Sequence, residues 1–89
     1  ILGKLVNLEE LEEFWRGKLE REVALVARPN ERRGVSLFLF YEGIEVDLAR
    51  WNASLPGPER LAEAIAIDLL PRSVLGKIDR LALTDFNKD

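Results

Sequence analysis

The chain has 89 residues and contains no His, Cys or Met, which excludes a Ser–His–Asp triad, a Cys nucleophile, disulfides and a Cys/His zinc site. The net charge of −3 argues against nonspecific nucleic-acid binding, and no apolar run approaches the roughly 20 residues of a membrane span. Hydrophobic residues make up 47% of the chain, so we expect one small soluble domain. Because a complete translation product starts with Met, we also expect a piece of a longer protein.

A helix is predicted over residues 7–19. An apolar stripe at helical spacing indicates it: Leu8, Leu11, Trp15 and Leu19. Asn7 is a suitable N-cap, with Glu10 three residues on, as in a capping box. Glutamates crowd the first turns, where the helix dipole favours negative charge, and we expect them to cap the helix and form a solvated face: Glu9, Glu10, Glu12 and Glu13.

Two strands are predicted next, over residues 22–28 and 35–41. Both are almost continuously apolar, which indicates burial on both faces and therefore a sheet covered by helices. Pro29, Asn30 and Gly34 supply a turn between them around a charged tip. Because this turn is short, antiparallel pairing is expected.

The second half of the chain continues the α+β pattern. Apolar residues at helical spacing predict a helix over residues 44–55: Ile44, Leu48, Trp51 and Leu55. Alternating Ile and Leu residues predict a strand over 64–69, and a short helix is expected over 78–86. The predicted fold class is α+β, a small three-stranded sheet packed with two to three helices. Trp15 and Trp51 lie on apolar stripes, so core packing is favoured over a role as stacking platforms.

The loop of residues 70–80 (LPRSVLGKIDR) carries the candidate chemistry. A flexible Gly76 allows close approach of the backbone to a ligand, and Lys77 beside it presents a point charge suited to a phosphate or carboxylate. A Gly-Lys pair alone is weak evidence and is more typical of a surface turn. The segment is not a P-loop, because no Gly lies five residues before Gly76.

The full segment resembles the last core motif of the adenylate-forming superfamily, which comprises acyl-CoA synthetases, nonribosomal peptide synthetase adenylation domains and luciferases. The matching positions are Leu70-Pro71, Ser73, Gly76-Lys77 and Arg80. The start of the chain, from Gly3 to Glu12, is similar to the family's segment after the hinge, with Glu10 and Glu12 on its two Glu positions. The resemblance identifies residues 1–89 as the mobile C-terminal subdomain of such a ligase, without its large N-terminal domain.

The resemblance implies a function in a cytoplasmic enzyme that activates a carboxylic acid as acyl-AMP and transfers the acyl group to a thiol. The full enzyme would use ATP and Mg, with CoA or the phosphopantetheine of an acyl carrier protein as acceptor, and would bind none of these through the isolated chain alone. Lys77 matches the catalytic Lys, supported by a loop with Ser73, Gly76 and Arg80. Gly3 and Lys4 would face the active site in the thiol half-reaction, and Glu10 and Glu12 would be structural or support the hinge. The N-terminal adenylation domain is the implied partner.

A non-catalytic binding module is the alternative, with a small anion-binding surface of Arg32, Arg33 and Lys77, and an oligomerisation module is a third option. The ligase hypothesis requires Lys77 at the exposed tip of a mobile loop, on a face otherwise free to meet a large partner. A binding module should instead contain a formed concave site.

Overall fold

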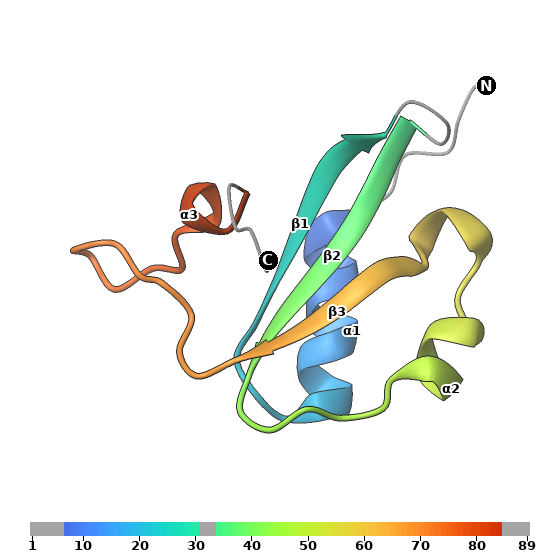
Figure 1. The fold of residues 1–89 in the computed structure, drawn as a ribbon, viewed down its shortest axis with the longest axis horizontal. Helices are drawn as coiled ribbons and strands as arrows, with labels where there is room; N and C mark the ends of the chain where they lie inside the picture. Colours follow the sequence, from blue (N-terminus) through green and yellow to red (C-terminus); the bar gives the residue numbers. More distant parts are fainter. Residues whose placement is uncertain (1–6, 31–33, 85–89) are drawn as a thin grey trace.

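The computed structural model describes residues 7–30 and 34–84 and shows an α+β fold, as predicted (Figure 1). A three-stranded sheet is combined with three helices and a short 3₁₀ turn. In chain order the elements are α1 (Leu8–Leu19), β1 (Val23–Asn30), β2 (Gly34–Glu42), α2 (Ala49–Ala53), the 3₁₀ turn (Gly57–Glu59), β3 (Leu61–Ile67) and α3 (Arg80–Thr84).

The strand order is β1-β2-β3. β1 and β2 pair antiparallel, with Val23 opposite Tyr41, which confirms the pairing expected from their short connection. β3 lies parallel to β2, with Phe40 opposite Ile65, so the chain has to cross over between them. α2 and the 3₁₀ turn form this crossover.

Hydrophobic side chains cover both faces of the sheet, as the apolar strands predicted. Leu37, Leu39 and Tyr41 of β2 pack into the cluster that α1 covers, together with Leu11 and Trp15. On the opposite face, a second cluster gathers strand residues and residues from the segment after β3: Ala24, Val26, Phe40, Leu70 and Leu83, flanked by Phe38, Ile65, Ile67 and Ile78. Within the described part of the chain, no helix is long and apolar enough to span a membrane.

The predicted cap of α1 is confirmed, and of the predicted stripe Leu11, Trp15 and the partly buried Leu19 face the core, whereas Leu8 is 37% exposed. The Asn7 side chain accepts a hydrogen bond from the Glu10 backbone N–H at 3.1 Å, which satisfies one of the free amides of the first turn. Trp15 is fully buried and meets Trp51 edge to face, with ring centroids 6.5 Å apart. Trp15 is therefore a core residue, and the partly buried Trp51 packs against the same cluster, so both contribute to core packing as predicted.

The helix predicted over residues 44–55 is wrong in its first half. Only Ala49–Ala53 is helical, and Ile44 is 81% exposed. Gly43 turns the chain at φ 108°, and the Tyr41 hydroxyl then accepts a hydrogen bond from the Val46 N–H at 2.9 Å and donates one to the Val46 carbonyl at 3.3 Å. These two bonds tie both backbone polar groups of Val46 to the Tyr41 side chain, and the segment before α2 stays irregular.

The last two predicted elements exist with shifted bounds. β3 begins at Leu61 and ends at Ile67, and Leu69 beyond it is 77% exposed. α3 begins at Arg80, because Ile78 forms a β-bridge with Arg72. The Asp79 carboxylate accepts a hydrogen bond from the Ala82 N–H at 3.2 Å and so caps this helix. The predicted end at residue 86 lies outside the described residues.

Candidate functional site

The predicted loop is a small β-hairpin that projects from the sheet between β3 and α3 (Figure 1, orange). Arg72 and Ile78 form an isolated antiparallel bridge. Two further backbone bonds close the legs, from Ser73 N–H to the Lys77 carbonyl at 2.7 Å and from Asp79 N–H to the Pro71 carbonyl at 2.8 Å. Lys77 is therefore the first residue after the turn, on a hydrogen-bonded leg.

Gly76 ends the turn in a left-handed conformation, with φ 86°. Its N–H donates to the Ser73 carbonyl at 2.9 Å, and its carbonyl accepts from the Arg72 guanidinium at 3.0 Å. This is the pattern of a three-residue hairpin loop that ends in a left-handed glycine. A Cβ at Gly76 would meet no atom within 4 Å, so the backbone angle alone favours glycine here.

Ser73 and Lys77 have different roles around this turn. The Ser73 hydroxyl accepts a hydrogen bond from the Leu75 N–H at 3.3 Å and so supports the turn. The Lys77 side chain is exposed, and among the described residues it has no ion-pair partner. The structure thus presents a cation that is available to a group from outside the described chain.

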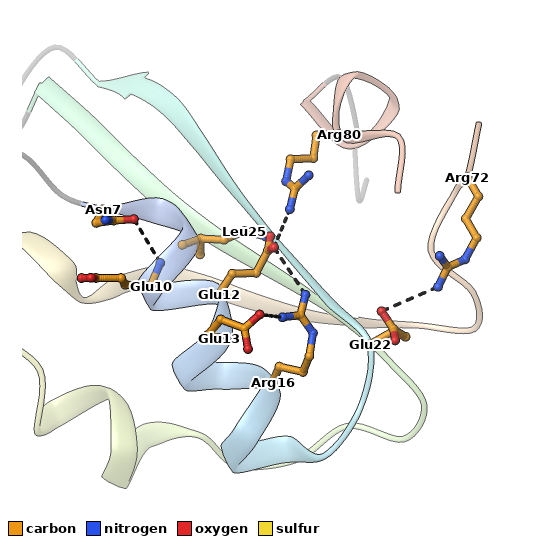
Figure 2. A network of polar contacts seen from close by, with 9 residues as sticks. All are labelled: Asn7, Glu10, Glu12, Glu13, Arg16, Glu22, Leu25, Arg72 and Arg80. Atoms are coloured by element: carbon orange, nitrogen blue, oxygen red, sulfur yellow. Dashed lines mark hydrogen bonds and ion pairs between the residues drawn. The ribbon is translucent and has the colours of Figure 1, made fainter. Parts of the chain in front are cut away.

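The incoming leg of the hairpin, residues 70–73, is fixed at its base. Leu70 is 3% exposed in the second cluster, and its N–H donates to the Glu42 carboxylate of β2 at 2.8 Å. Arg72 lies 3.7 Å from the Glu22 carboxylate, an exposed ion pair just before β1 (Figure 2). These contacts hold the incoming leg against the same end of the sheet.

The outgoing leg ends at Arg80, which contacts a glutamate from the other end of the chain (Figure 2). Arg80 Nη2 donates to Glu12 Oε1 at 2.5 Å, and Arg16 Nη2 lies 3.5 Å from the same oxygen. Glu12 Oε2 accepts the backbone N–H of Leu25 at 2.8 Å. Glu12 therefore joins α1, β1 and the start of α3.

This placement corrects the expectation that all four glutamates of α1 are solvated. Glu9, Glu10 and Glu13 are exposed, but Glu12 is only 6% exposed. A buried carboxylate requires hydrogen-bonding or charged partners, and Leu25 and Arg80 supply them. The sequence did contain a signal: Glu12 lies four residues after Leu8 and three before Trp15, within the apolar stripe.

Some predicted site residues lie outside the described residues. These are Gly3 and Lys4 of the thiol-facing segment and Arg32 and Arg33 of the alternative anion-binding surface. The structure therefore brings together Ser73, Gly76, Lys77 and Arg80 in one hairpin and its base, and it leaves the other four residues without a structural test.

An open hollow of about 480 Å³ lies elsewhere, between the segment before α2 and the start of β3. Its lining includes Glu45, Asp47 and Glu63 but not Lys77. The hollow is therefore separate from the hairpin cation, and the carboxylates in its lining do not favour an anion. Within residues 7–30 and 34–84, no three acidic side chains are placed to hold a metal ion.

No protein-family model matches the chain, and no curated protein matches it. Solved structures do match. The amide bond synthetase McbA from Marinactinospora thermotolerans aligns with 100% of this chain and 20% of its own, at TM-score 0.82 and 17% identity. MbtA from Mycobacterium smegmatis aligns with 92% of this chain and 17% of its own, at TM-score 0.77 and 27% identity. PA1221, an NRPS protein containing adenylation and PCP domains, aligns with 88% of this chain and 14% of its own, at TM-score 0.72 and 25% identity.

The chain thus spans a fifth or less of the length of these three proteins. Their structural similarity fits a C-terminal subdomain of the adenylate-forming superfamily, as the two sequence motifs implied. The matched proteins include an amide bond synthetase as well as an NRPS protein. The shared fold therefore does not distinguish an acyl-CoA synthetase from other adenylate-forming ligases.

Proposed function

We propose that this chain is the C-terminal subdomain of an ATP-dependent acid–thiol ligase and that it supplies the catalytic Lys77. The observation that carries the proposal is the position of Lys77 after the turn of a projecting hairpin, exposed and without an ion-pair partner among the described residues. The motif around it and the similarity to fragments of adenylate-forming proteins support the same function.

The chemistry explains why one ammonium group suffices. In the first half-reaction a carboxylate oxygen attacks the α-phosphorus of ATP, an acyl–phosphate bond forms, and pyrophosphate leaves. Both reactants are anionic, and negative charge accumulates on the phosphoryl oxygens in the transition state. A positioned ammonium offsets this charge at the place where it develops. In the second half-reaction a thiol sulfur loses its proton and attacks the acyl carbon, the bond from that carbon to the phosphate oxygen breaks, and a thioester and AMP result.

The remaining groups would come from elsewhere in the protein. We propose that an N-terminal adenylation domain binds ATP, its Mg and the acid, and that it meets this chain on the hairpin side. Val74 and Leu75 at the hairpin tip are 103% and 80% exposed, so they leave apolar surface for such a partner. CoA or the phosphopantetheine of an acyl carrier protein would accept the acyl group beside Gly3 and Lys4.

Replacement of Lys77 by Ala in the complete protein tests the proposal. Acid-dependent ATP–pyrophosphate exchange should fall by about 10²–10³-fold, the usual effect of removing a donor that stabilises developing charge. The acids supplied would be the proteinogenic amino acids, aryl acids and fatty acids of several lengths. The isolated 89-residue chain should show no exchange.

Lys18→Ala provides the matched control, because Lys18 is also an exposed lysine but lies on α1, over the Phe14 ring at 5.5 Å. Its exchange rate should equal that of the unmodified protein. Equal rates for the Lys77→Ala variant and the unmodified protein would refute the role of Lys77.

A further inference from the structure

The base of the Lys77 hairpin is joined to the opposite end of the chain. Arg80 and Glu12 are 68 residues apart in sequence, and their side chains meet at 2.5 Å. Glu12 lies on α1, which packs on one face of the sheet, whereas Leu83 of α3 packs on the other face. The contact therefore links both layers at the outer edge of β1, the strand that has β2 on one side only (Figure 2).

Glu12 is a rigid partner for Arg80. The Glu12 side chain is only 8% exposed, and the second oxygen of its carboxylate accepts the Leu25 N–H at 2.8 Å. This bond aligns the carboxylate with the backbone of β1, so its other oxygen points towards Arg80. A charge-assisted bond to an oxygen oriented in this way is short and directional.

The anchor lies close to Lys77 along the chain. Only three peptide units separate Arg80 from Lys77, which corresponds to about 10 Å of extended chain. The incoming leg is held independently, since the Leu70 N–H donates to Glu42 at 2.8 Å. With both legs fixed, the hairpin has little freedom to change its direction relative to the sheet.

We propose that Glu12 and Arg80 are positioning residues for Lys77. Their contact sets the direction in which the hairpin projects, so that the ammonium group reaches the reacting phosphate when the subdomain meets its partner. This inference rests on the proposed function of Lys77. It assigns to Glu12 a specific task, which is to orient the catalytic hairpin through Arg80, whereas the motif position alone implied only a structural or hinge-supporting residue.

The first test measures the hairpin directly, in the 89-residue chain. Glu12→Gln keeps an oxygen for the Leu25 N–H and removes the negative charge that Arg80 contacts. Glu13→Gln is the matched control, since the Glu13 side chain is 74% exposed on the same helix. Amide hydrogen exchange by NMR would be compared at Ser73 and Asp79, whose N–H groups close the hairpin.

In Glu12→Gln, exchange at Ser73 and Asp79 should rise about 2–5-fold, as expected for local opening after loss of a half-exposed ion pair, and exchange in the core at Leu39 should rise by no more than this factor. Glu13→Gln should change neither. Unchanged exchange at Ser73 and Asp79 in Glu12→Gln would overturn the proposal. A rise at Leu39 that exceeds the rise at Ser73 and Asp79 would also overturn it, because the carboxylate would then stabilise the fold without holding the hairpin closed.

The second test measures acid-dependent ATP–pyrophosphate exchange in the complete protein. Arg80→Gln should lower kcat on the order of 10–100-fold, the range expected for a misplaced catalytic group, with a smaller change in KM for ATP. Arg80→Lys should restore part of the rate, because it keeps a cation near Glu12. In a Lys77→Ala background, Arg80→Gln should cause no further loss, because its effect acts through Lys77.

The outcomes separate the two proposals. If Lys77→Ala leaves the rate unchanged, the proposed function is wrong, and the exchange test on the hairpin still decides whether Glu12 and Arg80 hold it. If Lys77→Ala lowers the rate but Arg80→Gln does not, the positioning role is wrong while the proposed function stands. Full additivity of Arg80→Gln and Lys77→Ala would likewise overturn the positioning role.

Discussion

Replacement of Glu12 by Ala should destabilise the fold far more than an exposed glutamate on α1 would suggest. The change leaves the Leu25 N–H without its acceptor, and Leu25 is only 2% exposed. An unsatisfied buried donor costs about 1–3 kcal/mol. Loss of the Arg80 contact adds about 0–1 kcal/mol, the value for a surface pair, because the Arg80 side chain is 50% exposed. The expected loss is about 1–4 kcal/mol, centred on about 2–3 kcal/mol.

That loss is a large part of the total. A domain of 89 residues has a free energy of unfolding of about 4–13 kcal/mol. Urea denaturation followed by circular dichroism should therefore show a lower midpoint with an unchanged slope. Thermal unfolding should show a Tm lowered by about 10–20 °C.

Two further variants of the 89-residue chain make the comparison decisive. Glu12→Gln keeps the bond to Leu25 and should lose only about 1 kcal/mol. Glu13→Ala removes an exposed pair with Arg16 and should lose less than about 0.5 kcal/mol. If Glu12→Ala unfolded at the same urea concentration as Glu13→Ala, the argument that Glu12 satisfies a buried amide would be refuted.

Two other predictions concern the turn and the core. Gly76→Ala should lower the unfolding free energy by about 1–2 kcal/mol, because of its φ of 86° alone. Gly17→Ala, inside α1 with open space around it, should instead stabilise the chain by up to about 1 kcal/mol. If the Gly76→Ala variant were as stable in urea as the unmodified chain, the left-handed turn would be contradicted. Trp15→Ala should cost about 3–5 kcal/mol, because Trp15 is fully buried. The fluorescence of a Trp51→Phe variant, which retains only Trp15, should be blue-shifted from that of Trp15→Phe, and equal spectra would contradict the burial of Trp15.

The sequence correctly predicted helices and strands that are determined by residues close together in the chain. Asn7 caps α1, and the stripe through Leu11 and Trp15 faces the core, because both effects depend only on helical spacing. The helix expected from Ile44 failed for the opposite reason. Tyr41 bonds the backbone of Val46, and this side chain–backbone contact overrides the apolar spacing.

The candidate site was predicted only in part. The motif identified Lys77 and its loop, but spacing could not show that the loop closes as a hairpin through Ser73 and Asp79. The contact between Glu12 and Arg80 joins residues that no local window contains together. The clustering of acidic residues predicted that Glu12 faces solvent. This clustering reflects only the neighbours along the helix and carries no information on what packs against it.

The hairpin tip has a consequence for how tolerant each position is to substitution. Leu70 and Ile78 pack into the second cluster, so the core restricts which side chains fit there. Val74 and Leu75 are 103% and 80% exposed, so the described fold places almost no restriction on them. In a saturation mutagenesis experiment, a loss of activity at Leu70 or Ile78 could result either from unfolding or from impaired function. Under the proposed function, losses of activity at Val74 and Leu75 would instead report contact of the hairpin tip with the adenylation domain.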